Sequence, residues 1–196
     1  FRADKRGMFG SKAAIADANK VKIADYATDA QNWISELKKQ TKRKCVWLAG
    51  HSEGALVALV AGQNGANICG IITIAGPGRK LGTVMREQFE KNPANAPVLP
   101  DALRALSELE GGRTVDVSKM HLALQGIFDP AVQPFLIDMF SYDPADVAAK
   151  TKLPMMIISG GRDLQVTAAD AEALSKANSK AKLVTLADMN HVLKVV

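Results

Sequence analysis

The stretch VWLAGHSEGALVALVAG, residues 46–62, restricts the fold more than any other part of the chain. An apolar, β-branched run leads into Gly-His-Ser-Glu-Gly, and an Ala/Leu/Val pattern typical of a buried helix follows directly. Gly50 and Gly54 flank Ser52 and remove the Cβ atoms that we expect to collide with neighbouring backbone. The stretch therefore predicts a strand, a tight turn that projects the serine, and a helix that begins at Glu53.

A second apolar strand follows this unit and completes a strand–helix–strand order. The predicted strands cover residues 44–50 and 69–78, and the helix between them ends near Gly62. The first strand is continuously apolar rather than alternating, as expected when helices cover both faces of a parallel sheet. This order, with short turns, is typical of α/β proteins with a mostly parallel sheet flanked by helices.

The remaining segments place a helical insertion inside this α/β frame. Beyond about residue 79 the pattern is helical only, until strands resume at 153–163 and 181–191 around a helix at 167–179. We divide the chain into an N-terminal part of the α/β core (1–78), a helical cap insertion (79–152) and a C-terminal part of the core (153–196). An amphipathic helix is predicted ahead of the first strand, with one apolar face made of Ile23, Tyr26, Ala27, Ala30, Trp33, Ile34 and Leu37.

Composition is that of an ordinary globular domain and excludes some classes of function. The 196 residues are 47% apolar and 23% charged, and the formal charge of +5 is spread along the chain. The densest basic cluster, residues 38–44, is expected to be a solvated surface, with a patch for anions or acidic partners as the alternative. No basic stretch carries interleaved aromatics, so we expect no nucleic-acid partner, and no apolar run reaches the ~18 residues of a membrane span.

The two cysteines, Cys45 and Cys69, each stand at the start of a predicted strand. We expect buried, reduced thiols, with no disulfide and no metal site. No signal peptide is visible in the printed chain, and the sequence leaves the compartment open with a slight preference for the cytoplasm.

A serine becomes a nucleophile near neutral pH only beside a base, and the chain has three histidines. His51 adjoins Ser52, so we expect its ring to point away from the hydroxyl and to pack. His121 lies in the helical insertion, with no strand end to position it. His191 follows the last strand and should reach the same edge of the sheet as Ser52, so we predict it as the base.

The base needs a carboxylate to fix its tautomer, and Asp163 directly follows a buried strand at that same edge. Asp188 is expected to cap the turn before His191, and Asp170 lies on a predicted helix. The predicted catalytic residues are Ser52, Asp163 and His191, with the Glu53 N–H at the helix N-terminus as an oxyanion donor. This chemistry requires no cofactor and no metal.

The motifs GHSEG, SGGRDLQV and NHVLK, in this order, resemble those of the α/β-hydrolase superfamily, in the branch of serine esterases and the serine aminopeptidase-like group. ADKRGMFGS, residues 3–11, is similar to the D-x-R-G-x-G-x-S loop that follows the fourth strand in that branch. The resemblance covers nearly the whole chain and implies an α/β-hydrolase fold with a Ser…Asp…His triad.

The chain also departs from the family pattern. The first three strands of the family, the loop that carries the second oxyanion donor and the final helix have no counterpart in it. Because the family's third strand lies beside the strand at residues 44–48, we predict an incomplete fold with an apolar open edge there. We expect that edge to be covered by a further segment of a longer protein or by a second copy in a homo-oligomer.

The leading interpretation is a serine hydrolase that cleaves small carboxylic esters of short to medium acyl chains through an acyl-enzyme on Ser52. A peptidase or amidase of the same fold is an alternative, as is a catalytically weak ligand-binding module, whereas a haloalkane dehalogenase would carry Asp at position 52. About a third of the large apolar cap residues are expected to line an acyl pocket and the rest to pack: Met85, Phe89, Leu103, Leu106, Phe128, Phe135, Met139 and Phe140.

Overall fold

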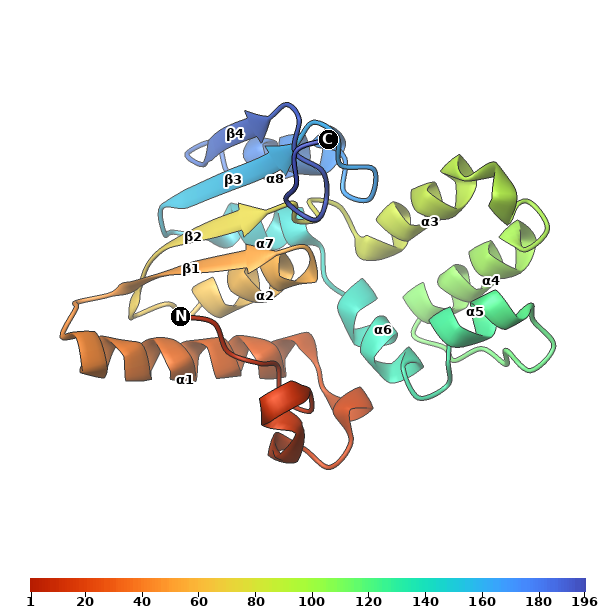
Figure 1. Cartoon of the computed structure of the whole chain (residues 1–196), viewed down its shortest axis with the longest axis horizontal. Helices are drawn as coiled ribbons and strands as arrows, with labels where there is room; N and C mark the ends of the chain where they lie inside the picture. The colour runs from red at the N-terminus through yellow and green to blue at the C-terminus, as the bar shows by residue number, and fades with distance from the viewer.

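The chain folds around a four-stranded sheet in which all neighbouring strands are parallel, in the order β1-β2-β3-β4 (Figure 1). The computed structural model describes the backbone of residues 1–196 and all side chains except that of residue 18. The strands are β1 (Val46–His51), β2 (Ile68–Ile74), β3 (Met155–Gly160) and β4 (Lys182–Leu186). The predicted fold class, a parallel α/β sheet flanked by helices, is confirmed, and the carboxyl ends of all four strands share one edge.

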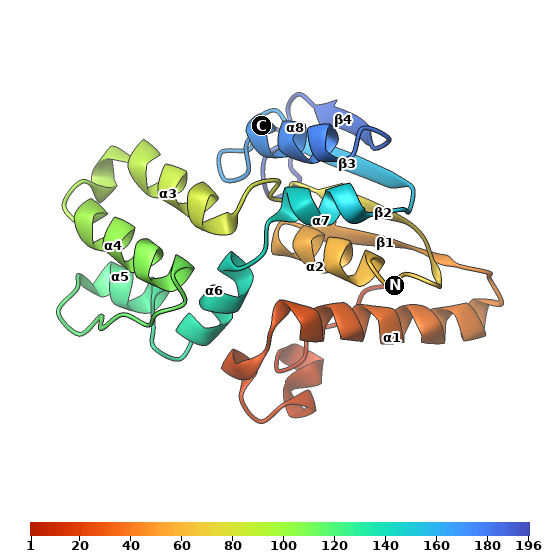
Figure 2. The same ribbon diagram turned by 180° about the vertical axis from the view of Figure 1, so that it is seen from behind.

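A layer of helices covers one face of this sheet, as the views from front and back both show (Figures 1 and 2). The layer consists of α1 (Ile23–Thr41), α2 (Glu53–Gly62), α7 (Pro144–Lys150) and α8 (Ala168–Ala177). α2 packs on β1 and β2, α8 packs on β3 and β4, and α1 and α7 pack against α2. Within the described part of the chain, no helix combines the length and apolar character that crossing a bilayer requires.

The opposite face of the sheet is less well covered than its apolar sequence predicts. Ile72 and Ile74 of β2 and Met156 and Ile158 of β3 are only partly buried, whereas the alternate residues Ile71 and Ile157 are fully buried. No helix among the described residues packs on that face, so the expectation that helices cover both faces is wrong here. The apolar pattern shows that both faces tolerate burial, but it does not show which elements bury them.

The predicted open edge is present at β1, which pairs with β2 alone among the described strands. A groove of about 390 Å³ runs along this edge, between β1, α1 and the N-terminal residues 1–5. Trp33 and Trp47 line the groove and are 43% and 53% exposed. Trp33 belongs to the predicted apolar face of α1, and it stays exposed because that part of the face borders the groove. The expectation that a further segment or a second copy covers this edge stays a prediction.

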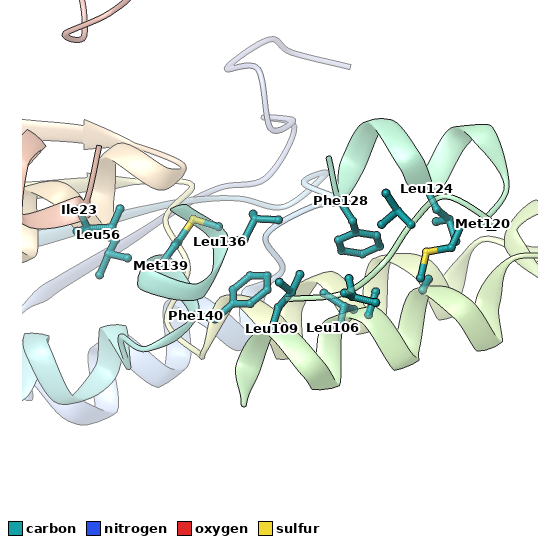
Figure 3. Close-up of a cluster of buried hydrophobic side chains, with 14 residues drawn as sticks. Ile23, Leu56, Leu106, Leu109, Met120, Leu124, Phe128, Leu136, Met139 and Phe140 are labelled. Carbon is teal, nitrogen blue, oxygen red and sulfur yellow. The ribbon is translucent and has the colours of Figure 1, made fainter. Parts of the chain in front are cut away.

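Four helices between β2 and β3 pack on one another beside the sheet: α3 (Leu81–Lys91), α4 (Leu99–Glu110), α5 (Leu122–Ile127) and α6 (Gln133–Phe140). Short 3-10 turns at Phe9–Ala14, Ala18–Lys20 and Pro93–Asn95 complete the elements. The hydrophobic cluster inside these helices includes Leu106 and Phe128, and it continues through Met139 to Leu56 of α2 (Figure 3). This cluster therefore joins the helical region to α1 and α2, the helices that cover the sheet, and α7 packs with the core helices α2 and α8.

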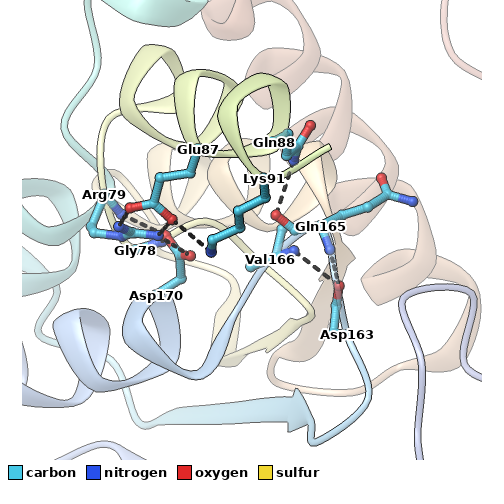
Figure 4. Close-up of polar contacts among 9 residues, drawn as sticks. All are labelled: Gly78, Arg79, Glu87, Gln88, Lys91, Asp163, Gln165, Val166 and Asp170. Atoms are coloured by element: carbon cyan, nitrogen blue, oxygen red, sulfur yellow. Dashed lines mark hydrogen bonds and ion pairs between the residues drawn. The ribbon is translucent and has the colours of Figure 1, made fainter. Parts of the chain in front are cut away.

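Polar contacts fix the point where the chain leaves β2 for α3 (Figure 4). The Asp170 carboxylate on α8 is fully buried and accepts hydrogen bonds from the Gly78 and Arg79 N–H groups at 3.1 and 3.2 Å and from Arg79 Nη2 at 2.9 Å. The Arg79 guanidinium also pairs with Glu87 on α3 and holds the pKa of that carboxyl below its usual range. Asp170, which the sequence placed merely on a helix, therefore anchors α3 to α8.

Replacing Arg79 should destabilise the fold, because it leaves the buried Asp170 carboxylate without its cation. We expect Arg79→Ala to lower the free energy of unfolding in urea by about 3 kcal/mol. Arg104→Ala is the matched control, since the Arg104–Asp101 pair lies on the surface with side chains 53% and 48% exposed, and it should change stability by less than about 1 kcal/mol. Equal effects of the two substitutions would contradict the anchoring role.

Cys45 and Cys69 form a disulfide, so the prediction of reduced thiols is wrong. The two residues are 24 positions apart in the sequence, but they stand at the adjacent N-terminal ends of β1 and β2, with Cα atoms 5.1 Å apart. The sequence does not show that the two strands are direct neighbours in this register. Disulfides persist mainly in oxidising compartments, which weighs against the preference for the cytoplasm.

Reduction of this bond should destabilise the protein, because the closed loop of 24 residues restricts the unfolded chain. We expect dithiothreitol, or the double variant with Cys45→Ser and Cys69→Ser, to lower the free energy of unfolding by about 3 kcal/mol. Urea denaturation with and without reductant measures the change. Two free thiols titrated in the non-reduced, unfolded protein would contradict the bond.

Candidate active site

Ser52 sits at the apex of a strained turn between β1 and α2. Its φ of 54° and ψ of −124° lie in a region that non-glycine residues rarely adopt, and its N–H donates to the Ile74 carbonyl at 2.9 Å. A Cβ on Gly50 would lie 1.9 Å from the Gly54 carbonyl oxygen, so only glycine fits there. A Cβ on Gly54 would meet nothing within 4 Å, because Gly54 borders the open groove, so the predicted collision is correct for Gly50 and wrong for Gly54.

The structure brings Ser52, His191 and Asp163 together at the carboxyl edge of the sheet, from the turn after β1 and the loops after β4 and β3. His191 Nε2 lies 3.1 Å from Ser52 Oγ, and His191 Nδ1 lies 2.8 Å from Asp163 Oδ2. The side chains of His191 and Asp163 are 12% and 0% exposed. In this arrangement the Nδ1–H donates to the carboxylate, and Nε2 is free to accept a proton from the serine hydroxyl.

Backbone groups hold the Asp163 carboxylate in place (Figure 4). Its Oδ1 accepts hydrogen bonds from the Gln165 and Val166 N–H groups at 2.8 and 2.9 Å. The other oxygen, Oδ2, is the one that faces His191. Each carboxylate oxygen therefore has its own partners, and the side chain cannot rotate without losing hydrogen bonds.

Asn190 organises the loop that carries His191. Its Oδ1 accepts from the Val192 and Lys194 N–H groups at 3.1 and 3.0 Å. Asp188, which we expected to cap this turn, is exposed and takes part through its carbonyl, which accepts from the Val196 N–H. Asn suits this position because its amide oxygen reaches the backbone two residues ahead.

The other two histidines lie elsewhere in the hydrogen-bond network. His121 is the N-cap of α5, where its Nδ1 accepts from the Ala123 N–H at 3.2 Å. His51 contacts the backbone of His191, with Nε2 2.7 Å from the carbonyl oxygen. We expected His51 to pack, but its ring instead makes a polar contact with the loop that carries His191.

Glu53 is the first residue of α2, so its N–H has no partner within the helix. Its carboxylate pairs with Lys5 at 2.6 Å, and the Lys5 ammonium lies 5.0 Å from the centre of the Tyr26 ring. The N-terminal loop that supplies Lys5 is fixed to α1, because Arg6 Nε donates to Asp29 at 2.6 Å. The loop that resembles D-x-R-G-x-G-x-S is therefore docked beside the turn at Ser52.

A cavity of about 140 Å³ opens beside Ser52 and His191. Of the eight cap residues, about a third of which were expected to line an acyl pocket, Met85 and Met139 line the cavity, whereas Leu106, Phe128 and Phe140 are buried inside the helical cluster. Sequence reasoning missed the remaining lining residues, Pro77, Leu81, Val84, Gln88, Gln165 and Val166. Positions 81, 84, 85 and 88 share one face of a helix. Helical spacing from Met85 is therefore the signal that could have found the missed residues Leu81, Val84 and Gln88 on α3.

The Asp163 geometry gives a sharp prediction for Asp163→Asn. The Asn oxygen can keep both backbone hydrogen bonds, which leaves its NH₂ group facing His191 Nδ1 and forces the wrong imidazole tautomer. For any hydrolysis catalysed at this site we expect kcat to fall by roughly 10⁴, the size of the effect of this substitution in a known Ser-His-Asp triad, with little loss of stability. A loss below about tenfold would show that Asp163 does not orient His191.

Comparison with known proteins agrees with this fold. No family model matches the chain. Esterase EstD of Thermotoga maritima is 30% identical over 169 residues, which is 84% of this chain but only 39% of the length of that relative. The chain therefore spans about two fifths of the curated relative that it matches.

Solved structures share the fold at lower identity. A lipase-esterase related protein from Clostridium acetobutylicum has a TM-score of 0.55 and 17% identity, covering 89% of this chain and 70% of that one. An α/β fold family hydrolase from Bacillus anthracis has a TM-score of 0.52 and 14% identity, covering 84% and 67%. The esterase Pf2001 of Pyrococcus furiosus has a TM-score of 0.51 and 21% identity, covering 85% and 53%. The chain therefore shares the fold of these hydrolases.

Proposed function

We propose that this protein is a serine hydrolase that cleaves carboxylic esters of short to medium acyl chains. One observation carries the proposal: Ser52, on its strained turn, lies 3.1 Å from a histidine that a buried aspartate orients at 2.8 Å. The similarity to an esterase supports the same class of substrate.

In the proposed reaction, Ser52 Oγ attacks the acyl carbonyl while His191 Nε2 takes the hydroxyl proton. Asp163 stabilises the imidazolium that forms, and the Glu53 N–H with the positive end of α2 stabilises the oxyanion. The tetrahedral intermediate collapses to an acyl-enzyme, and the alcohol leaves with the proton from His191. A water then gives a proton to His191 and attacks the acyl-enzyme, and His191 returns this proton to Ser52 Oγ as the acid leaves.

The cavity beside Ser52 favours short acyl groups. Its volume of about 140 Å³ is below the ~300–1,000 Å³ of pockets that enclose drug-sized ligands. Leu81, Val84 and Met85 give it an apolar wall from a single helix, α3, while Gln88 and Gln165 add polar groups. We therefore expect acetyl and butyryl esters to be better substrates than octanoyl esters.

Hydrolysis of p-nitrophenyl acetate, butyrate and octanoate tests the proposal. We expect kcat/KM to decrease from butyrate to octanoate in the wild type, and activity to be lost in Ser52→Ala and in His191→Ala. His121→Ala is the matched control and should keep its activity, because His121 only caps α5. Loss of activity in the control as well would move the role of base away from His191.

A fluorophosphonate probe and aminoacyl-anilides separate the alternatives. If the probe labels the wild type but not Ser52→Ala, Ser52 is an activated serine. If the probe does not label folded wild-type protein, the ligand-binding module is favoured. Faster turnover of anilides than of esters would favour the peptidase or amidase.

A further inference from the structure

His51 is the last residue of β1 and precedes Ser52 directly in the chain. Its side chain is exposed, and its Nε2 lies 2.7 Å from the main-chain carbonyl oxygen of His191. A carbonyl only accepts, so the contact requires a proton on His51 Nε2. The two imidazole rings have centroids 5.1 Å apart and a tilt of 43°, so the hydrogen bond, and not ring stacking, defines the contact.

We propose that His51 is a positioning residue that sets the distance between His191 and Ser52. The inference rests on the proposed serine hydrolase function, to which it adds a residue outside the predicted triad. His51 is joined to Ser52 by one peptide bond, so the hydrogen bond from His51 to the His191 backbone is a second link between nucleophile and base, besides the direct contact of Ser52 Oγ with His191 Nε2. Movement of the His191 loop away from Ser52 would break that bond.

The surroundings of His191 show why its backbone needs this contact. The loop after His191 is exposed, with Val192 at 60% and Leu193 at 46%, and Leu193 has a φ of 63°. Asn190 orders the residues after His191 but makes its contacts within the same loop. The His51 bond instead ties this loop to the end of a strand, which is a rigid element.

The contact with the His191 carbonyl needs a hydrogen-bond donor at the place of His51 Nε2, and it does not need a positive charge on the ring. The neutral imidazole with its proton on Nε2 donates as well as the imidazolium does. The side-chain amide of Gln carries a donor at a similar reach, so Gln can replace His51, whereas Phe keeps a ring of similar shape and removes the donor. This pair of substitutions separates hydrogen bonding from packing.

The test compares His51→Gln and His51→Phe, with His121→Gln and His121→Phe as matched controls at a histidine outside the site. For p-nitrophenyl butyrate we expect His51→Phe to lower kcat roughly ten- to a hundredfold, because misplacement of a catalytic group by a fraction of an ångström to 1 Å has effects of this order. KM should change by less than about threefold, since substrate contacts are kept, and His51→Gln should restore kcat to near that of the wild type. The two controls should leave kcat unchanged.

Proton NMR gives a readout that does not depend on turnover. The His191 Nδ1–H that donates to Asp163 should give a downfield resonance, assigned by its absence in His191→Ala, that shifts or broadens in His51→Phe and is kept in His51→Gln. If the wild type neither hydrolyses esters nor labels with fluorophosphonate, the proposed function fails, and this resonance still tests the positioning. The inference is overturned if His51→Phe keeps the kcat of the wild type and an unchanged resonance. It is also overturned if His51→Gln and His51→Phe lose kcat equally.

Discussion

The strained turn at Ser52 is the constraint on which the rest of the site depends. Its positive φ is held by a hydrogen bond to β2 and by the absence of a Cβ at Gly50. The turn lifts the hydroxyl above the carboxyl edge of the sheet and starts α2 at the next residue, so that an unpaired N–H lies beside the nucleophile. The loops that carry Asp163 and His191 then reach this point from the ends of β3 and β4.

The wall of the cavity depends on how the helical region is joined to the sheet. Arg79 and Asp170 fix the first turn of α3 against α8, and Asp138 on α6 accepts from the Ile23 N–H at the start of α1. Since Leu81, Val84 and Met85 on α3 line the cavity, the anchor at Arg79 also sets the shape of the space beside Ser52. Stability and the shape of the cavity are therefore linked through one buried carboxylate.

The apolar surface at β1 is poorly covered by the rest of the described chain. One edge of the strand is open, two tryptophans border the groove, and the sheet face beyond is only partly buried. Surfaces of this kind pair readily with other chains or segments. The Cys45–Cys69 disulfide lies at the start of this same strand and ties it to β2, so it stabilises the strand whose other side lacks a partner.

The sequence by itself determined the sheet class, the turn and the predicted triad, because glycine placement and apolar runs are local signals and parallel strands bring their carboxyl ends to one edge. It did not reveal the disulfide, the Asp170 anchor or the His51 contact. Each of these joins side chains from segments far apart in the chain, such as positions 51 and 191, whose separation in space depends on strand register and helix packing. Only the tertiary structure decided them, because no local pattern encodes which of several polar side chains meets a given partner.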